Sequence, residues 1–303
     1  MPYVFMFPGQ GSQKVGMGAD LVSGVASVKA RFDQADVILG RPLSKLILEG
    51  PEDELKSTQN TQPALFLLEA AIVDVLRGRG IEPVATMGHS LGEYSALYAA
   101  GVFGFEDGLR LVAKRGELMA KAGAASKGVM AAVIGLSSAQ IREALKNVTA
   151  GVIVPANENS PDQTVISGEA AAFESASEIL KAAGAKRVIQ LPVSGAFHSP
   201  LMKPAADEFK NFLEQVNFAD AKCPVITNVT AAPETKGSVL KGLLYDQLLN
   251  PVRWVDSVAA LSAFGSFTAV EVGPGSVLKG LVKKCSQDLN VVLCETSDNV
   301  YSV

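Results

Sequence analysis

A serine flanked by two glycines has the clearest potential for chemistry in this sequence. Residues 84–92 read Val-Ala-Thr-Met-Gly-His-Ser-Leu-Gly, so a short apolar run leads into a Gly-x-Ser-x-Gly pattern centred on Ser90. Helix-forming residues follow at 93–100. This order of strand, sharp turn and helix is typical of a nucleophile elbow, which holds a serine hydroxyl out of the backbone at a helix N-terminus. An ordinary glycine-rich turn is the alternative.

A serine nucleophile needs a base, and histidine is the usual one near neutral pH. The sequence has two histidines, His89 and His198. His89 adjoins Ser90, where neighbouring side chains diverge, so it is badly placed to reach the hydroxyl. His198 follows a Gly-Ala-Phe loop between two predicted domains, which is where clefts form. We therefore favour His198 as the base over an incidental loop histidine.

The position of His198 argues against a generic α/β-hydrolase. Those enzymes place an acidic residue after the serine and the histidine late in the chain, whereas a long stretch of sequence follows His198. A Ser–His dyad is physically sufficient when a backbone carbonyl orients the imidazole, because the third member of a triad chiefly fixes tautomer and orientation.

Arg115 lies in an amphipathic segment, residues 106–123, whose other charged residues form one solvated stripe. Its neighbours three and four positions away are leucine, valine and methionine, so its side chain projects from the apolar face. A buried cation needs a partner, and no acidic residue of the same helix is placed to provide one. A ligand carboxylate is one candidate, because a guanidinium matches a carboxylate in a bidentate fork. A structural pair or snorkelling to the rim is the alternative.

A glycine-rich loop, Gly9-Gln10-Gly11-Ser12-Gln13, follows the apolar N-terminal segment. Lys14 stands where a GxGxxG pattern needs its third glycine, and no GxxxxGK[ST] pattern occurs, so phosphate binding is not favoured. The flexible backbone can instead bring an N–H group close to a ligand. A purely structural loop is the alternative.

Strand-like and helical segments alternate along most of the chain, which predicts a parallel sheet covered on both faces. The apolar segment 1–8 is expected to form a buried first strand, and 267–272 a late one. A helix is expected over 61–79, with Thr61-Gln62-Pro63 as its start signal.

Residues 126–193 depart from this alternation. The segment is predicted to contain strands at 128–134, 152–156, 163–167 and 187–191 and helices at 138–146 and 170–183. Their order is the β-α-β-β-α-β order of a ferredoxin-like unit. The polar segment 157–161 is expected to be a loop that could face a cleft, with a plain turn as the alternative.

We therefore predict an α/β fold class with two domains. A large, discontinuous α/β-hydrolase-like domain with a parallel sheet core spans 1–125 and 194–303. A small ferredoxin-like domain at 126–193 is inserted in it.

Composition excludes several classes of protein. A net charge of −4 and a pI near 5.4 do not suit a nucleic-acid-binding surface. Two histidines and three scattered cysteines give little basis for a metal site or a disulfide framework. No apolar run approaches the roughly 20 residues of a membrane span, and the N-terminus lacks the features of a signal peptide. We expect a soluble, cytoplasmic monomer with reduced cysteines.

Five motifs occur in one order along the chain: Phe7-Pro8-Gly9-Gln10-Gly11-Ser12-Gln13, Gly88-His89-Ser90-Leu91-Gly92-Glu93-Tyr94, Lys114-Arg115-Gly116, Gly195-Ala196-Phe197-His198-Ser199 and Glu271-Val272-Gly273-Pro274-Gly275. As a set they resemble the malonyl-CoA:acyl carrier protein transacylases, the loading enzymes of bacterial fatty-acid synthesis. The resemblance runs from the first strand to the last helix, and the joint set is far more specific than any single motif.

The resemblance implies a ping-pong transfer. Ser90, with His198 as base, would take the malonyl group from malonyl-CoA and pass it to the phosphopantetheine thiol of acyl carrier protein. Arg115 matches the arginine that binds the malonyl carboxylate. No bound cofactor is implied, because coenzyme A arrives as a thioester substrate and the partner protein carries the phosphopantetheine.

The resemblance also assigns supporting residues. The backbone N–H groups of Gln10 and Leu91 match the oxyanion hole. Gln247 matches the residue whose main-chain carbonyl orients the histidine, and Met119 and Asn157 are expected to line the cleft.

Other functions remain open at this stage. A thioesterase or esterase could use the same dyad with water as acceptor, and a non-catalytic carrier-binding protein could keep the fold. A domain of a polyketide synthase is a further option, although the length and the absence of linker-like ends favour a free-standing enzyme.

Because an acyl carrier protein is acidic, the docking face should be basic. The candidates are Lys186, Arg187, Lys279, Lys283 and Lys284.

Overall fold

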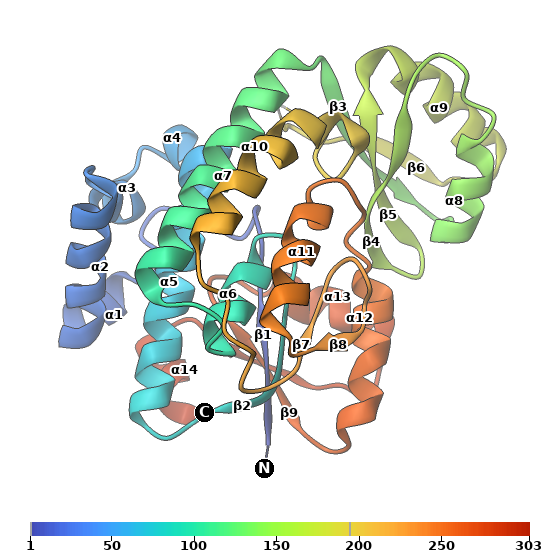
Figure 1. Cartoon of the computed structure of the whole chain (residues 1–303). Helices are drawn as coiled ribbons and strands as arrows, with labels where there is room; N and C mark the ends of the chain where they lie inside the picture. Colours follow the sequence, from blue (N-terminus) through green and yellow to red (C-terminus); the bar gives the residue numbers. More distant parts are fainter. Residues whose placement is uncertain (1, 194) are drawn as a thin grey trace.

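The computed structural model describes residues 2–193 and 195–303. Met1 and Ser194, which begin the two predicted segments of the large domain, lie outside the described residues. Over the described residues the main sheet has six strands in the order β10-β9-β1-β2-β7-β8 (Figure 1). Their bounds are β1 Tyr3–Phe7, β2 Pro83–Gly88, β7 Val225–Ile226, β8 Pro233–Glu234, β9 Thr268–Val272 and β10 Val291–Cys294. The pairings are parallel except for the antiparallel pair β7–β8.

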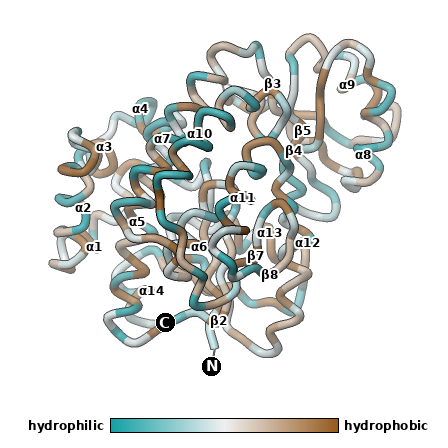
Figure 2. Tube along the Cα trace, viewed as in Figure 1, coloured by the Kyte–Doolittle hydropathy of each residue, from teal (hydrophilic) through white to brown (hydrophobic). Residues whose placement is uncertain are grey.

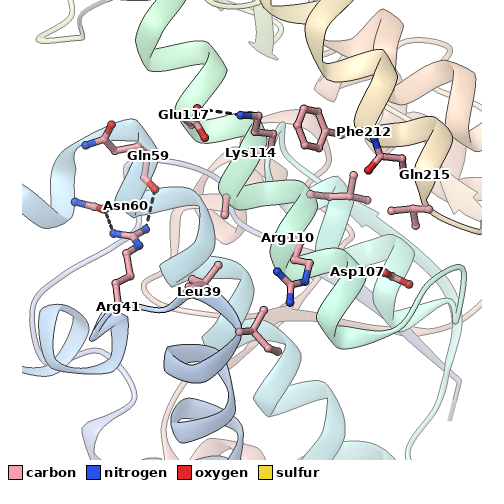
Figure 3. Close-up of a pocket in the computed structure, with 14 residues that line it drawn as sticks. Leu39, Arg41, Gln59, Asn60, Asp107, Arg110, Lys114, Glu117, Phe212 and Gln215 are labelled. Atoms are coloured by element: carbon pink, nitrogen blue, oxygen red, sulfur yellow. Dashed lines mark hydrogen bonds and ion pairs between the residues drawn. The ribbon is translucent and has the colours of Figure 1, made fainter.

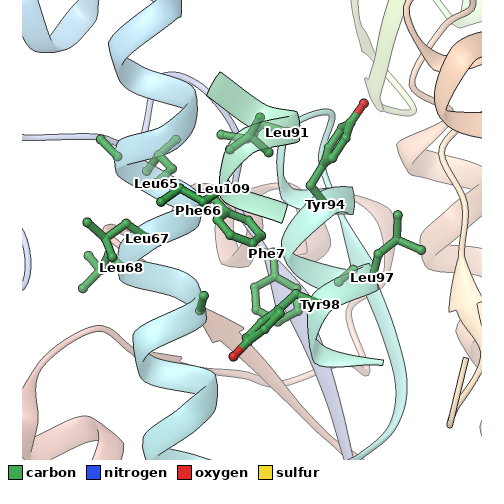
Figure 4. Close-up of a cluster of buried hydrophobic side chains, with 14 of the residues drawn as sticks. Phe7, Leu65, Phe66, Leu67, Leu68, Leu91, Tyr94, Leu97, Tyr98 and Leu109 are labelled. Carbon is green, nitrogen blue, oxygen red and sulfur yellow. The ribbon is translucent and has the colours of Figure 1, made fainter. Parts of the chain in front are cut away.

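Both faces of this sheet are buried, which explains the unbroken apolar character of β1. Phe5 and Phe7 point into one hydrophobic cluster, whereas Val4 and Met6 point into another on the opposite face. The first cluster contains residues of α5 (Thr58–Gly78), α6 (Gly92–Ala99) and α7 (Phe105–Ala125), and Figure 4 shows its centre. The second contains residues of α12 (Trp254–Ala260) and α13 (Val277–Cys285).

Further helices pack around this sheet and the helices that cover it, and hydrophilic and hydrophobic residues alternate along several of them (Figure 2). Their bounds are α1 Ala19–Gly24, α2 Ala26–Leu39, α3 Leu43–Glu49, α4 Glu52–Lys56, α10 Lys203–Gln215, α11 Gly237–Gln247, α12 Trp254–Ala260, α13 Val277–Cys285 and α14 Ser297–Ser302, with short 3-10 turns η1 Pro200–Met202 and η2 Leu261–Phe264. In the described part of the chain, no helix is both long enough and apolar enough to span a membrane.

A second sheet lies beside the first, at the upper right of Figure 1. Among the described residues it has four antiparallel strands in the order β4-β5-β3-β6. Its elements are β3 Gly128–Ile134, α8 Ser138–Leu145, β4 Ile153–Ser160, β5 Gln163–Glu169, α9 Ala170–Ala182 and β6 Arg187–Gln190. The predicted order of strands and helices is confirmed, and the unit has its own hydrophobic cluster. The domain boundaries themselves stay a prediction.

The predicted start of α5 was wrong. The helix begins at Thr58, so Pro63 lies inside it instead of at its first turn. Proline has no N–H to donate to the carbonyl four residues earlier, which here belongs to Gln59. That carbonyl instead accepts a 3.3 Å hydrogen bond from Arg41 Nη2, which compensates for the missing helical bond.

The predicted loop at 157–161 was also wrong, because β4 continues to Ser160. Two irregularities in its pairing with β5 let the strand bend. Its far end pairs with the main unit as well: Val252 N–H donates to the carbonyl of Ala156, and Glu158 N–H donates to the carbonyl of Val252, both at 2.8 Å. A contact distant in the sequence therefore extends a segment whose composition indicates a turn.

Candidate active site

The strand, turn and helix predicted around Ser90 are present, with β2 ending at Gly88 and α6 beginning at Gly92. Ser90 has φ of 52°, in the left-handed region that non-glycine residues rarely adopt. A Cβ atom on Gly92 would lie 2.0 Å from the carbonyl oxygen of Phe7, so the turn packs too closely on β1 for a side chain there. The tight turn thus fixes the serine at the end of the strand.

Ser90 and His198 meet although they are far apart in the sequence. His198 Nε2 lies 2.7 Å from Ser90 Oγ, and His198 Nδ1 lies 2.8 Å from the main-chain oxygen of Gln247. A carbonyl only accepts, so Nδ1 carries the proton and Nε2 offers its lone pair to the serine hydroxyl. Burial, together with the charge of Arg115, lowers the pKa of His198 to about 3, so the imidazole is neutral near pH 7.

His89 does not contact the serine hydroxyl. Its Nε2 lies 2.8 Å from Asn159 Oδ1 on β4, and its ring lies 5.6 Å from that of Trp254. Burial lowers the pKa of His89 as well. Its contacts join the turn at Ser90 to the second sheet, which agrees with the choice of His198 as the candidate base.

Arg115 is buried beside the serine. Its Nη2 donates to Ser90 Oγ at 3.1 Å and to Gln247 Oε1 at 3.0 Å, and its Nη1 donates to Gln62 Oε1 at 2.7 Å. Within residues 2–193 and 195–303, no carboxylate forms an ion pair with it. Close packing of α7 on α5 places it there, since a Cβ on Gly116 would lie 2.8 Å from the carbonyl oxygen of Thr58.

The candidate oxyanion donors face the same space. Gln10 and Leu91 both line the cavity at Ser90, and the Gln10 side chain donates to Thr58 Oγ1 at 3.2 Å. In the described part of the chain, neither backbone N–H donates to a protein acceptor. Two free N–H groups beside a nucleophile are what an oxyanion requires.

The cavity itself has a volume of about 130 Å³ and lies between the two sheets. We call it the Ser90 cavity, and it is lined by Gln10, Gln62, His89, Ser90, Leu91, Arg115, Met119, Met130, Asn157, Leu191, Val193, Phe197 and His198. Met119 and Asn157 are thus at its wall, as expected. Met119 Sδ also accepts a 3.4 Å hydrogen bond from Gln62 Nε2.

Sequence reasoning missed residues that hold the nucleophile in place. Asn228, just after β7, accepts from Ser90 N–H at 2.8 Å and donates to the carbonyl of Gly88 at 2.6 Å. It therefore spans the strained turn. Its position after a buried strand, at the end of the sheet where Ser90 lies, was a usable signal. Gln62 was read only as part of a helix start, which hid its contact with Arg115.

A larger cavity lies elsewhere, between α2, α5, α7 and α10 (Figure 3). We call it the outer groove. Its volume is about 740 Å³, and it is lined by Ile38, Leu39, Arg41, Gln59, Asn60, Asp107, Arg110, Leu111, Ala113, Lys114, Glu117, Phe212, Gln215 and Val216. None of the residues predicted to take part in the reaction lines it. Size alone therefore does not identify the site.

No metal centre is apparent, since the described residues contain no cluster of three or more histidine, cysteine, aspartate or glutamate side chains that could hold an ion. Cys223, Cys285 and Cys294 are free thiols. Burial raises the pKa of each, so none is activated as a thiolate.

Comparison with known proteins agrees with this geometry. Residues 4–297 match the family described as "Acyl transferase domain". The malonyl CoA-acyl carrier protein transacylase of Bacillus subtilis (strain 168) is 46% identical over 298 residues, which cover 98% of this chain and 94% of that protein. The crystal structure of an acyl carrier protein S-malonyltransferase from Vibrio cholerae superposes with a TM-score of 0.96 at 43% identity, covering 100% of this chain and 99% of that one.

A second similar structure is a malonyl-transacylase in complex with its type II PKS acyl-carrier protein. It has a TM-score of 0.95 at 41% identity and covers 100% of this chain and 98% of that one. These matches confirm the predicted fold class, with a parallel sheet core and a separate small antiparallel sheet.

Proposed function

The chain belongs to the acyl transferase domain family, and we propose that it transfers the malonyl group of malonyl-CoA to the phosphopantetheine thiol of acyl carrier protein. The observation that carries the proposal is that three groups meet in one cavity: a neutral His198, the Ser90 hydroxyl, and a buried Arg115 that forms no ion pair with any carboxylate of the described residues. The first two form an acyl-transfer dyad. The third selects an acyl group that ends in a carboxylate.

In the first half-reaction, His198 Nε2 takes the hydroxyl proton as Ser90 Oγ attacks the thioester carbonyl. The backbone N–H groups of Gln10 and Leu91 stabilise the oxyanion, each by about 3 kcal/mol in the transition state. The C–S bond then breaks, and the imidazolium gives its proton to the sulfur of coenzyme A. A malonyl ester remains on Ser90.

In the second half-reaction the same groups act in reverse. The carrier thiol gives its proton to His198, and its sulfur attacks the malonyl ester. The bond to Ser90 Oγ breaks, and the serine recovers its proton from the imidazolium. The chain needs no bound cofactor for either step, because both thiols arrive with the substrates.

Arg115 links substrate recognition to the basicity of His198. In the free protein its positive charge helps to lower the pKa of His198. A malonyl carboxylate paired with the guanidinium neutralises this charge, so the imidazole becomes a better base when the correct substrate is bound. An acetyl group cannot have this effect.

Hydrolysis with water as acceptor is less well supported, because the similar proteins named above are transacylases.

We also propose that the protein acts in the cytoplasm as a monomer, without nucleic-acid or membrane partners. Light scattering should then give a mass near 31.6 kDa; a dimer would contradict the monomer.

The proposed intermediate can be tested directly. Incubation with malonyl-CoA should add one malonyl group to the protein, seen by intact mass spectrometry, and Ser90→Ala should abolish it. Transfer rates should fall by about a thousandfold or more, as for other nucleophile deletions. A malonyl adduct on the Ser90→Ala protein would refute the mechanism. Release of free malonate instead of malonyl-carrier, with both acceptors present, would favour the thioesterase.

A further inference from the structure

One buried carboxyl group beside the site has no part in the mechanism above. Glu93, in the first turn of α6, is 1% exposed. Its Oε2 accepts a 2.6 Å hydrogen bond from Gln247 Nε2 and a 3.3 Å bond from Asn228 N–H. Among the described residues it forms no ion pair. A carboxyl group removed from water and held only by neutral donors is costly to ionise, which points to a role for it at this position.

The hydrogen bonds of Gln247 show what Glu93 controls. The amide nitrogen donates to Glu93 Oε2 and, at 2.9 Å, to the carbonyl of Ser90. The amide oxygen is thereby turned toward Arg115, from which it accepts at 3.0 Å. If the Gln247 amide were flipped, its NH₂ group would face the N–H donors of Arg115 and its oxygen would face the acceptor oxygen of Glu93, so both hydrogen bonds would be lost.

Arg115 depends on this orientation because its acceptors are neutral: Gln62 Oε1, Gln247 Oε1 and Ser90 Oγ. A substrate carboxylate near the serine would replace the contact with Ser90, which leaves the two glutamine oxygens to hold the guanidinium. We infer that Glu93 is a positioning residue for acyl selection: through Gln247 it aims Arg115 at the carboxylate of the acyl group. The inference rests on the proposed function.

The placement of Glu93 also keeps it from competing with the substrate. One amide group separates its carboxylate from the guanidinium, so Arg115 stays free to pair with an incoming carboxylate. Burial raises the pKa of Glu93 to about 7, although Gln247, Asn228 and Arg115 oppose this shift. In either protonation state one oxygen can accept from Gln247.

A purely structural role is the competing explanation, since an acidic residue in the first turn stabilises a helix. The two roles differ in what a mutation changes. Loss of helix stability would affect malonyl and acetyl transfer equally. Loss of the acceptor for Gln247 should affect malonyl transfer more, because Arg115 interacts with the carboxylate that acetyl lacks.

The test compares Glu93→Met with Glu93→Gln, which have similar volumes but differ in whether an acceptor oxygen is kept. The rate of acyl-enzyme formation is measured for malonyl-CoA and for acetyl-CoA by rapid quench and intact mass. Glu69→Met serves as a matched control, because Glu69 is also fully buried and, within the described residues, no hydrogen bond joins it to Gln247 or Arg115.

We expect Glu93→Met to lower the malonyl-to-acetyl rate ratio by about tenfold, the worth of one buried hydrogen bond. Glu93→Gln should stay within about threefold of the unmodified protein, and Glu69→Met should leave the ratio unchanged. Equal losses for both substrates in Glu93→Met would overturn the inference. So would a tenfold fall in the ratio for Glu93→Gln, which decides the matter if the methionine variant does not fold. An unmodified protein that forms no malonyl adduct would instead refute the proposed function.

Discussion

The outer groove and the Ser90 cavity each hold an arginine bound by oxygens of neutral groups, and of these two only the smaller is suited to chemistry. In the outer groove, the half-buried Arg41 donates to Asn60 Oδ1 and to the carbonyl of Gln59. In the Ser90 cavity, the fully buried Arg115 donates to Gln62, Gln247 and Ser90. The groove has about 740 Å³ and the Ser90 cavity about 130 Å³.

The difference lies in how the charges are compensated. Other cations of the groove are paired within their own helix, Arg110 with Glu106 at 2.8 Å and Lys114 with Glu117 at 3.0 Å. Such exposed pairs contribute little energy and are screened by water. Arg115 is buried and, among the described residues, forms no ion pair, so an arriving carboxylate meets a cation whose attraction is barely weakened. A cation that is buried away from water beside a nucleophile, more than a large cavity volume, is what makes a reactive site.

The sharpest test of this contrast removes each arginine in turn. Arg115→Ala should lower kcat/KM for malonyl-CoA by about a hundredfold or more, as expected when one partner of a buried charge pair is lost. Acetyl transfer should fall far less. Arg41→Ala should change malonyl transfer by no more than about twofold. Steady-state kinetics with malonyl-CoA and acetyl-CoA would measure these effects. A larger loss for Arg41→Ala than for Arg115→Ala would indicate that the substrate binds in the outer groove.

A second test uses pH. The base must be neutral to accept the serine proton, and burial with the charge of Arg115 lowers the pKa of His198 to about 3. The acid limb of kcat/KM for His198 should therefore lie well below pH 6.5, the usual value of a free imidazole. Removal of the cation in Arg115→Gln should move this limb to higher pH. An acid limb near 6.5 in the unmodified protein would contradict the electrostatic argument.

The smallest expected effect concerns where the carrier protein approaches. Lys283 and Lys284 are exposed near the end of α13, whereas Arg110 lines the outer groove. Changing both lysines to glutamate should raise KM for the carrier by about three- to tenfold, since charge at a rim chiefly alters association. The half-reaction with malonyl-CoA should be unaffected. Arg110→Glu is the matched control, and a larger effect there would place the docking face over the groove.

Local patterns predicted much of this protein correctly. Alternation of strands and helices gave the parallel sheet, and the spacing of short strands gave the inserted antiparallel unit. The periodicity of α7 indicated that Arg115 projects from the apolar face, because side-chain direction in a helix follows from position alone. The prediction of where α5 begins was wrong because it depends on a contact that is not local: a hydrogen bond from Arg41 compensates for a proline inside the helix.

By itself, the sequence determined the tight turn at Ser90, the buried direction of Arg115 and the choice between two histidines. These features depend on the conformation of the glycines, on the spacing of residues along a helix and on the position of His89 next to Ser90, all of which are local properties of the sequence. Only the tertiary structure decided that Asn228 clamps the turn and that Glu93, through the side-chain amide of Gln247, orients the arginine. Those residues come from separate elements, and a hydrogen bond between distant segments depends on packing that no local pattern records.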